Sequence, residues 1–294
     1  MGKVSAGTVA ALVVAMLVVL APASSHAADN TAPVDYTALP VGSTVKKIPW
    51  EKFNIQGGAF FAVLNNQVTA GTEGTGVVID LEKATGLDTQ STVFRLGGLY
   101  RFGETRRHRV DLDYLYFNRN ASKSVADNLV VNGQPINAGS NVDTTFNFQI
   151  YRAAYSYSFF QDDRMDLAAS IGLFVMPIKF ELSVSGVGSK QGDFNFTAPL
   201  PALGLRGDFA VTPRWFIRTN LDVFYLEYQS FKGALVDTRI AVEYNPWEHF
   251  GFGLGFDNFR VKLEAEGNDY PGVDFQGIVK SQFMGVQLYA RYFF

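Results

Sequence analysis

The chain has 294 residues, no cysteine and a formal net charge of −3. The lack of cysteine excludes a disulfide scaffold and a thiolate metal site, and the near-neutral charge gives no sign of a nucleic-acid partner. The sequence is 47% hydrophobic, with 26 Phe and 13 Tyr, and only 18% of its residues are charged. The folded chain must therefore keep a large apolar surface away from water.

The first 28 residues have the features of a secretory signal peptide. Lys3 is their only charged residue, an apolar run covers 9–20, and small residues follow. This apolar core is too short to span a bilayer, and cleavage after Ala27 or Ala28 fits the pattern. We therefore predict that the exported chain begins with a periplasmic segment, 29–50, which is either unstructured or lies against the folded domain formed by 51–294.

Ten later segments alternate between apolar and polar residues with a period of two, which is typical of strands with one apolar face. They lie at about 52–66, 91–103, 108–119, 144–160, 164–180, 199–211, 214–230, 233–245, 248–263 and 278–294. No segment after the signal peptide is apolar for 18 consecutive residues, so no membrane-spanning helix is expected. The sequence predicts an all-β, antiparallel, up-and-down transmembrane barrel of about ten strands, with eight or twelve as alternatives.

Two segments depart from this simple pattern. Residues 74–83 also alternate, and we expect them to form a strand extension or a hairpin above the membrane. Within 144–160 the apolar residues change parity, which predicts a β-bulge near Tyr151 and Arg152.

The last strand is apolar at every second position up to the terminal residue. These positions are Met284, Val286, Leu288, Ala290, Tyr292 and Phe294. A terminal aromatic of this kind resembles the closing strand of Gram-negative outer-membrane barrels, where it belongs to the signal read by the assembly machinery. The resemblance implies that Tyr292 and Phe294 form an assembly signal, with that machinery and outer-membrane lipids as partners.

The connections between the predicted strands alternate in length. Short connections are expected at 103–107, 161–163, 212–213 and 245–247, and long ones at 67–90, 120–143, 181–198 and 264–277, with 231–233 as a short exception. Because such barrels have short periplasmic turns and long outer loops, both termini are predicted to be periplasmic. Trp50, Trp215 and Trp247 lie at the short-turn end, which predicts an aromatic girdle at the inner interface.

The face opposite the apolar face carries six arginines and six acidic residues. A lipid-facing arginine costs about 2–4 kcal/mol at the bilayer midplane, so we expect these residues to face the lumen: Arg95, Arg101, Arg109, Asp111, Asp113, Arg206, Asp208, Arg218, Asp222, Asp237, Arg239 and Glu243. Their equal numbers favour paired side chains that fill a narrow lumen, because a guanidinium can bind both oxygens of a carboxylate. A small water-filled pore of mixed charge is the alternative.

Candidate catalytic residues are few. Omptin proteases and lipid A acyl-modifying enzymes need a histidine with acidic or hydroxyl partners near the outer rim, but His108 and His249 both lie beside short turns. We expect no catalytic, cofactor or metal site. We interpret the basic turn Arg106-Arg107-His108-Arg109 as solvated, with contact to anionic headgroups as the alternative.

Several motifs resemble a family of proteobacterial outer-membrane barrels, most of whose members have no assigned activity. They are RLGGLYRF (95–102), HRVDLDYLYFNR (108–119), APLPALGLRGDF (198–209) and FGFGLGFDNFRV (250–261). The broad architecture is similar to OmpA- and OmpW-type barrels, which implies an outer-membrane location but no ligand. We expect a monomeric, non-enzymatic envelope protein with a filled lumen. The alternatives are a narrow porin-like channel and, with less support, a lipid-modifying enzyme or protease.

Overall fold

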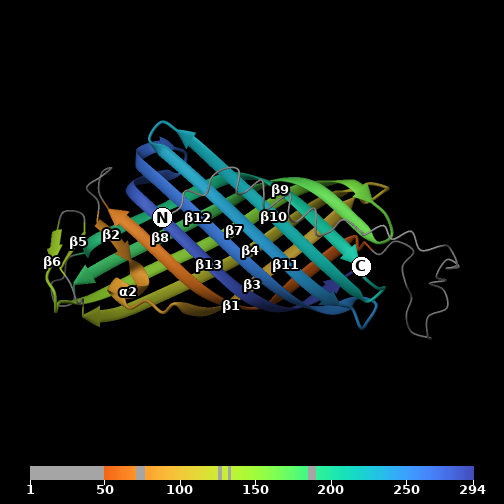
Figure 1. Cartoon of the computed structure of the whole chain (residues 1–294), viewed down its shortest axis with the longest axis horizontal. Helices are drawn as coiled ribbons and strands as arrows, with labels where there is room; N and C mark the ends of the chain where they lie inside the picture. Colours follow the sequence, from red (N-terminus) through yellow and green to blue (C-terminus); the bar gives the residue numbers. More distant parts are fainter. Residues whose placement is uncertain (1–49, 71–76, 125–127, 132–133, 185–189) are drawn as a thin grey trace, which may run out of the picture. The chain divides into compact units, whose positions relative to one another are not determined.

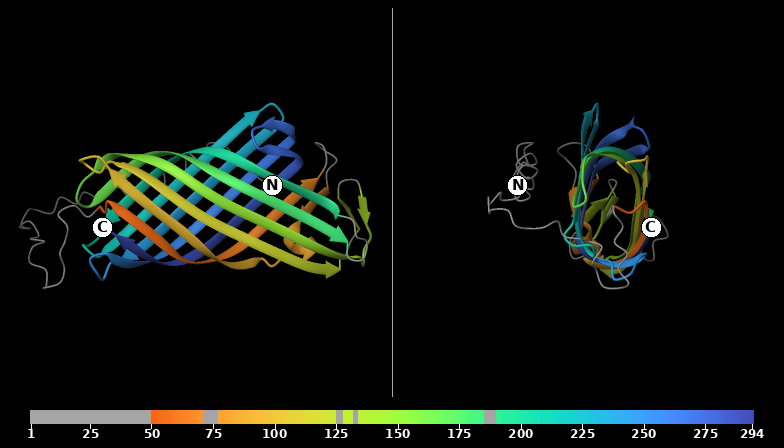
Figure 2. Two further views of the ribbon diagram at one scale, coloured as in Figure 1. Left: turned by 180° about the vertical axis from the view of Figure 1, so that it is seen from behind. Right: turned by 90° about the vertical axis from the view of Figure 1, so that its right-hand side faces the viewer.

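Ten antiparallel strands form a closed ring in the computed structural model, which describes residues 50–70, 77–124, 128–131, 134–184 and 190–294. The strands are β1 (Phe53–Ala70), β3 (Gln90–Phe102), β4 (His108–Ser124), β7 (Asn141–Gln161), β8 (Met165–Val184), β9 (Lys190–Ala210), β10 (Trp215–Tyr228), β11 (Phe231–Tyr244), β12 (Phe250–Tyr270) and β13 (Val273–Phe293). Each pairs with its neighbour in the chain, and β13 pairs with β1 to close the ring (Figure 1; Figure 2). The predicted ten-stranded up-and-down barrel is confirmed.

The predicted signal peptide and residues 29–49 lie outside the described residues. Among the residues that the structure describes, no helix is long and apolar enough to cross a membrane.

Both ends of the barrel domain lie at the end with the short turns. The backbone N–H groups of Lys52 and Phe53 donate to the carbonyl of Phe294 at 2.7 and 2.9 Å. The turns between β3 and β4, β7 and β8, β9 and β10, and β11 and β12 lie at the same end. We call it the short-turn end and the opposite end the long-loop end.

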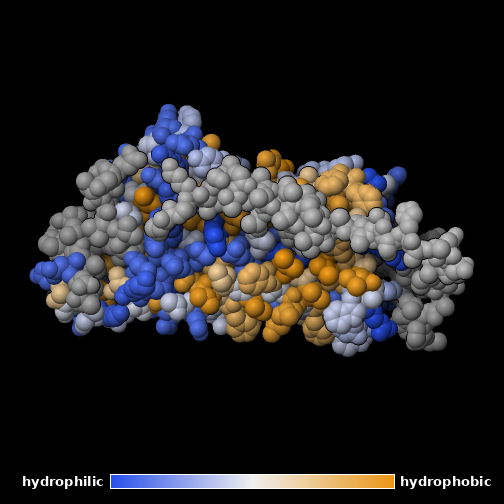
Figure 3. Space-filling view, viewed as in Figure 1, coloured by the Kyte–Doolittle hydropathy of each residue, from blue (hydrophilic) through white to orange (hydrophobic). Residues whose placement is uncertain are grey.

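The outer surface near the short-turn end is apolar. On β3, Phe94, Leu96, Tyr100 and Phe102 are exposed, and the alternate residues are turned inward. Figure 3 shows hydrophobic residues gathered over this part of the visible face, with hydrophilic residues towards the long-loop end. Such a band around a closed barrel is the surface that a bilayer requires.

The three tryptophans do not share one environment. Trp215 and Trp247 are exposed on the outer surface near the short turns. Trp50 is fully buried, and its indole N–H donates to the Asp162 carbonyl at 2.8 Å. The prediction that Trp50 belongs to an interfacial girdle is therefore wrong, because its side chain is buried beside the β7–β8 turn.

Towards the long-loop end the strands continue, but their two faces exchange polarity. On β12 the outward residues change from Phe256 and its apolar predecessors to Arg260 and Lys262. The inward residues change from Asp257 to the buried Phe259 and Val261. This half of the barrel has an apolar interior and a polar exterior, as a water-soluble barrel does.

This exchange corrects two expectations. The parity change in 144–160 is not a bulge near Tyr151, because β7 keeps one register with β4 and alternates without interruption from buried Phe148 to buried Ser156. The register shift in β7 lies between Ser158 and Phe160. In the described residues, the expected loops at 181–198 and 264–277 are largely strand, because β8, β9, β12 and β13 continue into them.

The expected strand or hairpin at 74–83 divides into two elements. β2 (Val77–Asp80) pairs with the end of β1, and α2 (Leu81–Thr85) follows it. The Asp80 carboxylate accepts from the Lys83 N–H at 3.1 Å, and Gly86 ends the helix with φ +77°. A side-chain N-cap and a left-handed glycine are strong helix boundaries, which explains why the alternating pattern stops here.

The wall of the barrel is lower at β10 and β11 than at their neighbours. Above this hairpin the tip of β12 and β13 reaches β9, where the Thr197 N–H donates to the Gly272 carbonyl at 3.0 Å. Tyr270 stacks on Phe231 at 4.0 Å between ring centroids. A Cβ at Gly272 would lie 2.4 Å from the Thr197 carbonyl oxygen, so this approach requires glycine.

Candidate functional site

The lumen contains two successive layers of side chains, with α2 beyond them. The first, nearest the short-turn end, holds charged residues and is called the ionic layer. It contains eight arginines and nine carboxylates: Arg95, Arg101, Arg109, Arg152, Arg206, Arg218, Arg239, Arg291, Glu51, Asp111, Asp113, Asp166, Asp208, Asp222, Asp237, Glu243 and Asp257. The side chains are buried or nearly so, which is possible only because opposite charges meet.

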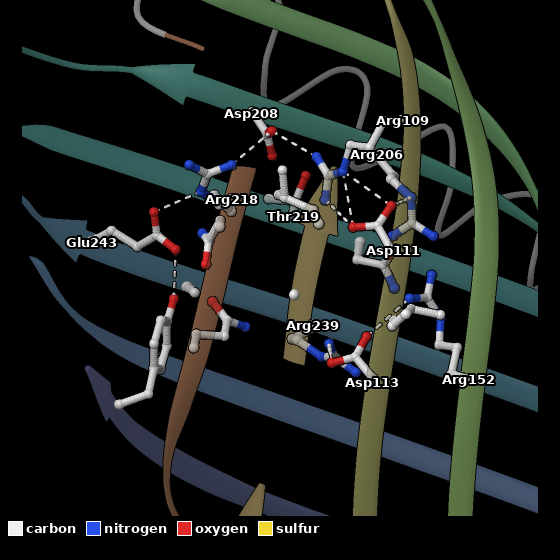
Figure 4. A pocket seen from close by; sticks show the side chains of 18 residues that line it. Arg109, Asp111, Asp113, Arg152, Arg206, Asp208, Arg218, Thr219, Arg239 and Glu243 are labelled. Carbon is white, nitrogen blue, oxygen red and sulfur yellow. Dashed lines mark hydrogen bonds and ion pairs between the residues drawn. The ribbon is translucent and has the colours of Figure 1, made fainter. Parts of the chain in front are cut away.

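Asp208 accepts hydrogen bonds from three guanidiniums of the ionic layer. Its Oδ2 accepts from Arg101 at 2.7 Å, from Arg109 at 2.8 Å and from Arg218 at 3.0 Å. Arg101 and Arg109 face each other on neighbouring strands, so Asp208 reaches across the lumen to neutralise a pair of like charges. Figure 4 shows Asp208 between the Arg109 and Arg218 side chains, which come from different strands.

Glu51 and Arg291 join the two ends of the barrel domain. Glu51 precedes β1, and its Oε1 accepts from Arg218 at 2.6 Å and from Arg291 at 2.8 Å. Arg291, on the last strand, also pairs with Glu243, whose other oxygen accepts from the Tyr289 hydroxyl at 2.8 Å. These contacts fix the lead-in to β1 against the closing strand.

The Glu51 carboxyl lies before the first spanning strand. Burial raises its pKa, but the guanidinium groups of Arg218, Arg291 and Arg101 lower it by more, so that this pKa lies well below its ordinary value. Glu51 is therefore a carboxylate at neutral pH, and its charge stabilises the three guanidiniums around it.

A second group of charges lies deeper in the lumen. Arg239 donates to Asp113 at 3.0 Å and to Asp257 at 3.1 Å, and Arg95 pairs with Asp257 from the other side. Arg152 donates to Asp222 at 2.9 Å and to Asp113 at 3.0 Å. Three of these pairs, Arg239–Asp113, Arg95–Asp257 and Arg152–Asp222, join strands that are not neighbours, so they cross-link the wall through its interior.

The structure places all twelve charged residues expected in the lumen on inward-facing positions, and it shows which of them pair. Asp222 meets Arg152 and not Arg218, and Asp208 is the residue opposite Arg218 on β9. Asp237 is within 3.4 Å of Arg239 on its own strand.

Five further charged residues complete the layer: Glu51, Arg152, Asp166, Asp257 and Arg291. Strand parity alone identifies Asp166, Asp257 and Arg291 as inward-facing. It does not identify Arg152, because the bulge expected near Tyr151 and Arg152 leaves the direction of that side chain undefined. Glu51 has no such signal because it precedes the strand.

Two small cavities lie in the ionic layer among the residues that the structure describes. One cavity of about 70 Å³ lies between Arg109, Arg206, Arg218 and Arg239, and a second of about 10 Å³ lies beside Asp237. Since a water molecule takes up about 30 Å³ in the liquid, these volumes correspond to a few waters.

Six phenylalanines from six strands form the next layer, called the phenylalanine layer: Phe60, Phe117, Phe148, Phe174, Phe259 and Phe283. Phe259 stacks on Phe283 at 4.8 Å, Phe283 contacts Phe117 at 5.2 Å, and Phe148 contacts Phe259 at 6.1 Å. Phe148 and Phe259 belong to β7 and β12, which are not neighbours, so their contact spans the lumen. These rings are at most 2% exposed.

The helix α2 lies beyond the phenylalanine layer, towards the long-loop end. Leu81 is fully buried in the same hydrophobic core. Glu82 accepts from the inward-facing Asn66 and Arg119 side chains at 2.8 Å each. This buried ion pair ties α2 to β1 and β4.

The two histidines of the described chain lie at the short-turn end. His108 Nδ1 lies 2.7 Å from the Tyr155 hydroxyl, and His249 Nδ1 lies 3.0 Å from the Phe293 carbonyl oxygen. In the part of the chain that the structure describes, no three His, Cys, Asp or Glu residues are arranged to hold a metal ion.

No family model matches the sequence, and no curated protein matches it. Among solved structures, the outer-membrane protease OmpT of Escherichia coli is similar, with a TM-score of 0.50 and 9% identity over 82% of this chain and 97% of that chain. Ail, the attachment invasion locus protein of Yersinia pestis, has a TM-score of 0.35 and 13% identity over 81% of this chain and 99% of that one. The toluene transporter TodX of Pseudomonas putida has a TM-score of 0.33 and 8% identity over 82% and 89%. The likeness to OmpT shows the fold of an outer-membrane barrel, and at these identities none of the three assigns a role.

Proposed function

We propose that this protein is a structural component of the outer membrane whose lumen is sealed, and that it is neither a pore nor an enzyme. The observation that carries the proposal is the phenylalanine layer, because the Phe117–Phe283 and Phe148–Phe259 contacts join strands on different sides of the lumen. An ion or solute that follows the lumen would have to displace these buried rings and, before them, the paired charges of the ionic layer.

The same features support an orientation. In this proposal the short turns and both termini of the barrel are periplasmic, and the apolar band lies in the bilayer. The half with a polar exterior then projects from the outer surface as a rigid barrel, closed by α2 and by the β12–β13 tip. Such a barrel suits an envelope role in which surface segments are held away from the membrane.

Neither alternative has comparable support. A narrow porin-like channel requires continuous water, whereas the two lumen cavities in the ionic layer are small and enclosed by ion pairs. A lipid-modifying enzyme or protease of the known barrel types requires a histidine at the outer rim, whereas His108 and His249 lie at the other end.

Solute efflux from proteoliposomes tests the proposal. Vesicles that contain the refolded protein and a trapped small sugar should lose the sugar at the rate of protein-free vesicles. A general porin reconstituted in parallel shows that the assay detects a channel, and the heat-modifiable gel band shows that the barrel is folded. Efflux that rises with the amount of folded protein would refute a sealed lumen.

A further inference from the structure

The outer face of the barrel has an apolar groove of about 500 Å³ across β1, β3, β4, β7 and β8. Strand register explains its shape. Gly98, Leu112, Ala153 and Leu173 are consecutive cross-strand partners and form one row on the outer face. Because Gly98 and Ala153 are small, this row is hollow on both sides of Leu112.

Larger side chains border the hollow row on either side. Towards the long-loop end the next row contains Tyr114 and Tyr151, whose rings are 4.8 Å apart. Towards the short-turn end the next row contains Tyr100, Val110 and Tyr155. The groove is therefore a built depression in the apolar band, and its lining is almost wholly apolar.

The groove leads towards a polar cluster at the short-turn end of the same strands. His108 stacks on Phe102 at 5.2 Å, and its Nδ1 lies 2.7 Å from the Tyr155 hydroxyl. Arg107 precedes His108, and its carbonyl accepts from the Ser158 N–H at 2.9 Å, which fixes the turn on β7. The Arg106 guanidinium donates to the Trp50 carbonyl at 2.9 Å, and His108 Nδ1 is engaged by Tyr155, so Arg107 and the Nε2 of His108 remain for a ligand.

We propose that this groove and turn form a binding site for one phospholipid of the periplasmic leaflet with an anionic headgroup. An acyl chain fills the hollow beside Leu112, and Arg107 and His108 contact the phosphate. Five residues separate Arg107 from Leu112, which is roughly 17 Å along a tilted strand. This length is comparable to half of a hydrocarbon core about 30 Å thick. The proposal rests on the orientation proposed above, with the short turns in the periplasm.

Native mass spectrometry of the full folded barrel in detergent, with added phosphatidylglycerol or phosphatidylcholine, tests the site. Ala153→Leu fills the groove, and Ala234→Leu makes the same change on the outward face of β11, away from it. The double variant Arg107→Ala, His108→Phe removes the basic groups and keeps an aromatic ring. Its matched control is Arg214→Ala, His249→Phe, at the other short turns.

We expect the wild type to retain one phosphatidylglycerol at concentrations where phosphatidylcholine is lost. Ala153→Leu and the Arg107, His108 variant should each weaken this retention by about tenfold, and neither control should. Equal retention of the two lipids, an unchanged Ala153→Leu, or equal losses in the controls would overturn the proposal. Lipid retention and solute efflux are separate readouts, so a failure here leaves the sealed lumen untouched. Antibody access to inserted tags tests the orientation that both share.

Discussion

Arg218 on β10 donates a 2.6 Å hydrogen bond to Glu51, 167 residues earlier in the chain, across the short-turn end of the lumen. Arg218 also donates to Asp208 at 3.0 Å and to Glu243 at 2.6 Å. One guanidinium thus holds together the segment before β1 and strands β9, β10 and β11. The ionic layer thus links segments of the barrel that are far apart in the sequence.

Arg218→Ala should lower the free energy of unfolding measurably. Removing one partner of a buried pair costs roughly 3–5 kcal/mol when burial is complete, and the remaining partners of the three carboxylates reduce that cost. Glu51→Gln should restore part of the loss, because it removes a charge that Arg218 compensates. Asp222→Asn should restore none, since Asp222 pairs with Arg152. Urea unfolding of Arg218→Ala and of the two double variants measures whether Glu51→Gln, and not Asp222→Asn, restores stability.

Asp208→Asn should be the most destabilising neutralisation of a carboxylate in the ionic layer. Three guanidiniums donate to Asp208, so about 3–5 kcal/mol is expected for leaving buried charge uncompensated. Asp163→Asn, in the exposed turn between β7 and β8, is the control and should be neutral. If both variants unfold at the wild-type urea concentration, the ionic layer does not stabilise the barrel.

The barrel should lose stability in acid partly through Glu51. The pKa of Glu51 is depressed in the folded state, so its contribution is complete above its unfolded pKa of about 4.3 and is lost as the pH falls below that value. In Glu51→Gln the free energy of unfolding should be lower at neutral pH and should fall less as the pH drops below about 4.3. Parallel curves for the variant and the wild type would show that Glu51 is not a charge partner of this layer.

Phe294 should matter for assembly. Its N–H donates to the Phe53 carbonyl at 3.0 Å, and its ring lies 5.2 Å from that of Phe53, so it seals the contact between the last and first strands. Deleting Tyr292 to Phe294 should reduce the heat-modifiable band in membranes, whereas Phe252→Ala, another exposed aromatic near the short-turn end, should not. An undiminished band after the deletion would mean that assembly does not depend on this end of β13.

Epitope tags inserted at the two ends of the barrel should report its orientation in the outer membrane. A tag between β5 (Leu129–Val131) and β6 (Gln134–Ile136) should bind antibody on intact cells. A tag in the turn after Gln161 should bind only after permeabilisation. The opposite result would reverse the barrel in the membrane.

The sequence predicts the membrane half of this barrel well and the projecting half poorly, for one physical reason. Where lipid is outside, apolar residues mark the outer face, and the parity of Phe94 or Leu288 identifies inward residues such as Arg95 and Arg291. Where water is outside, the same rule selects the wrong face, so it places Phe148 outward and requires a bulge to place Tyr155 outward as well.

The partners of each lumen charge could not be predicted in the same way. Parity places Arg218 and Asp222 on one face of β10, but the pairs form across the lumen between strands far apart in sequence. Glu51 precedes β1 and contacts Arg218, and the adjacent Trp50 is buried with its ring centroid 6.4 Å from that of Phe216. Neither contact has a local signal in the sequence.

Single-channel recording in planar bilayers tests the sealed lumen most directly. Because the phenylalanine layer and the ionic layer both close the path, the folded wild-type protein should give no current steps above the lipid baseline, under conditions where a general porin does. Discrete steps of constant size would contradict the account, decisively so if Arg218→Ala shifted their reversal potential towards cation selectivity, because Arg218 would then line a conducting pore.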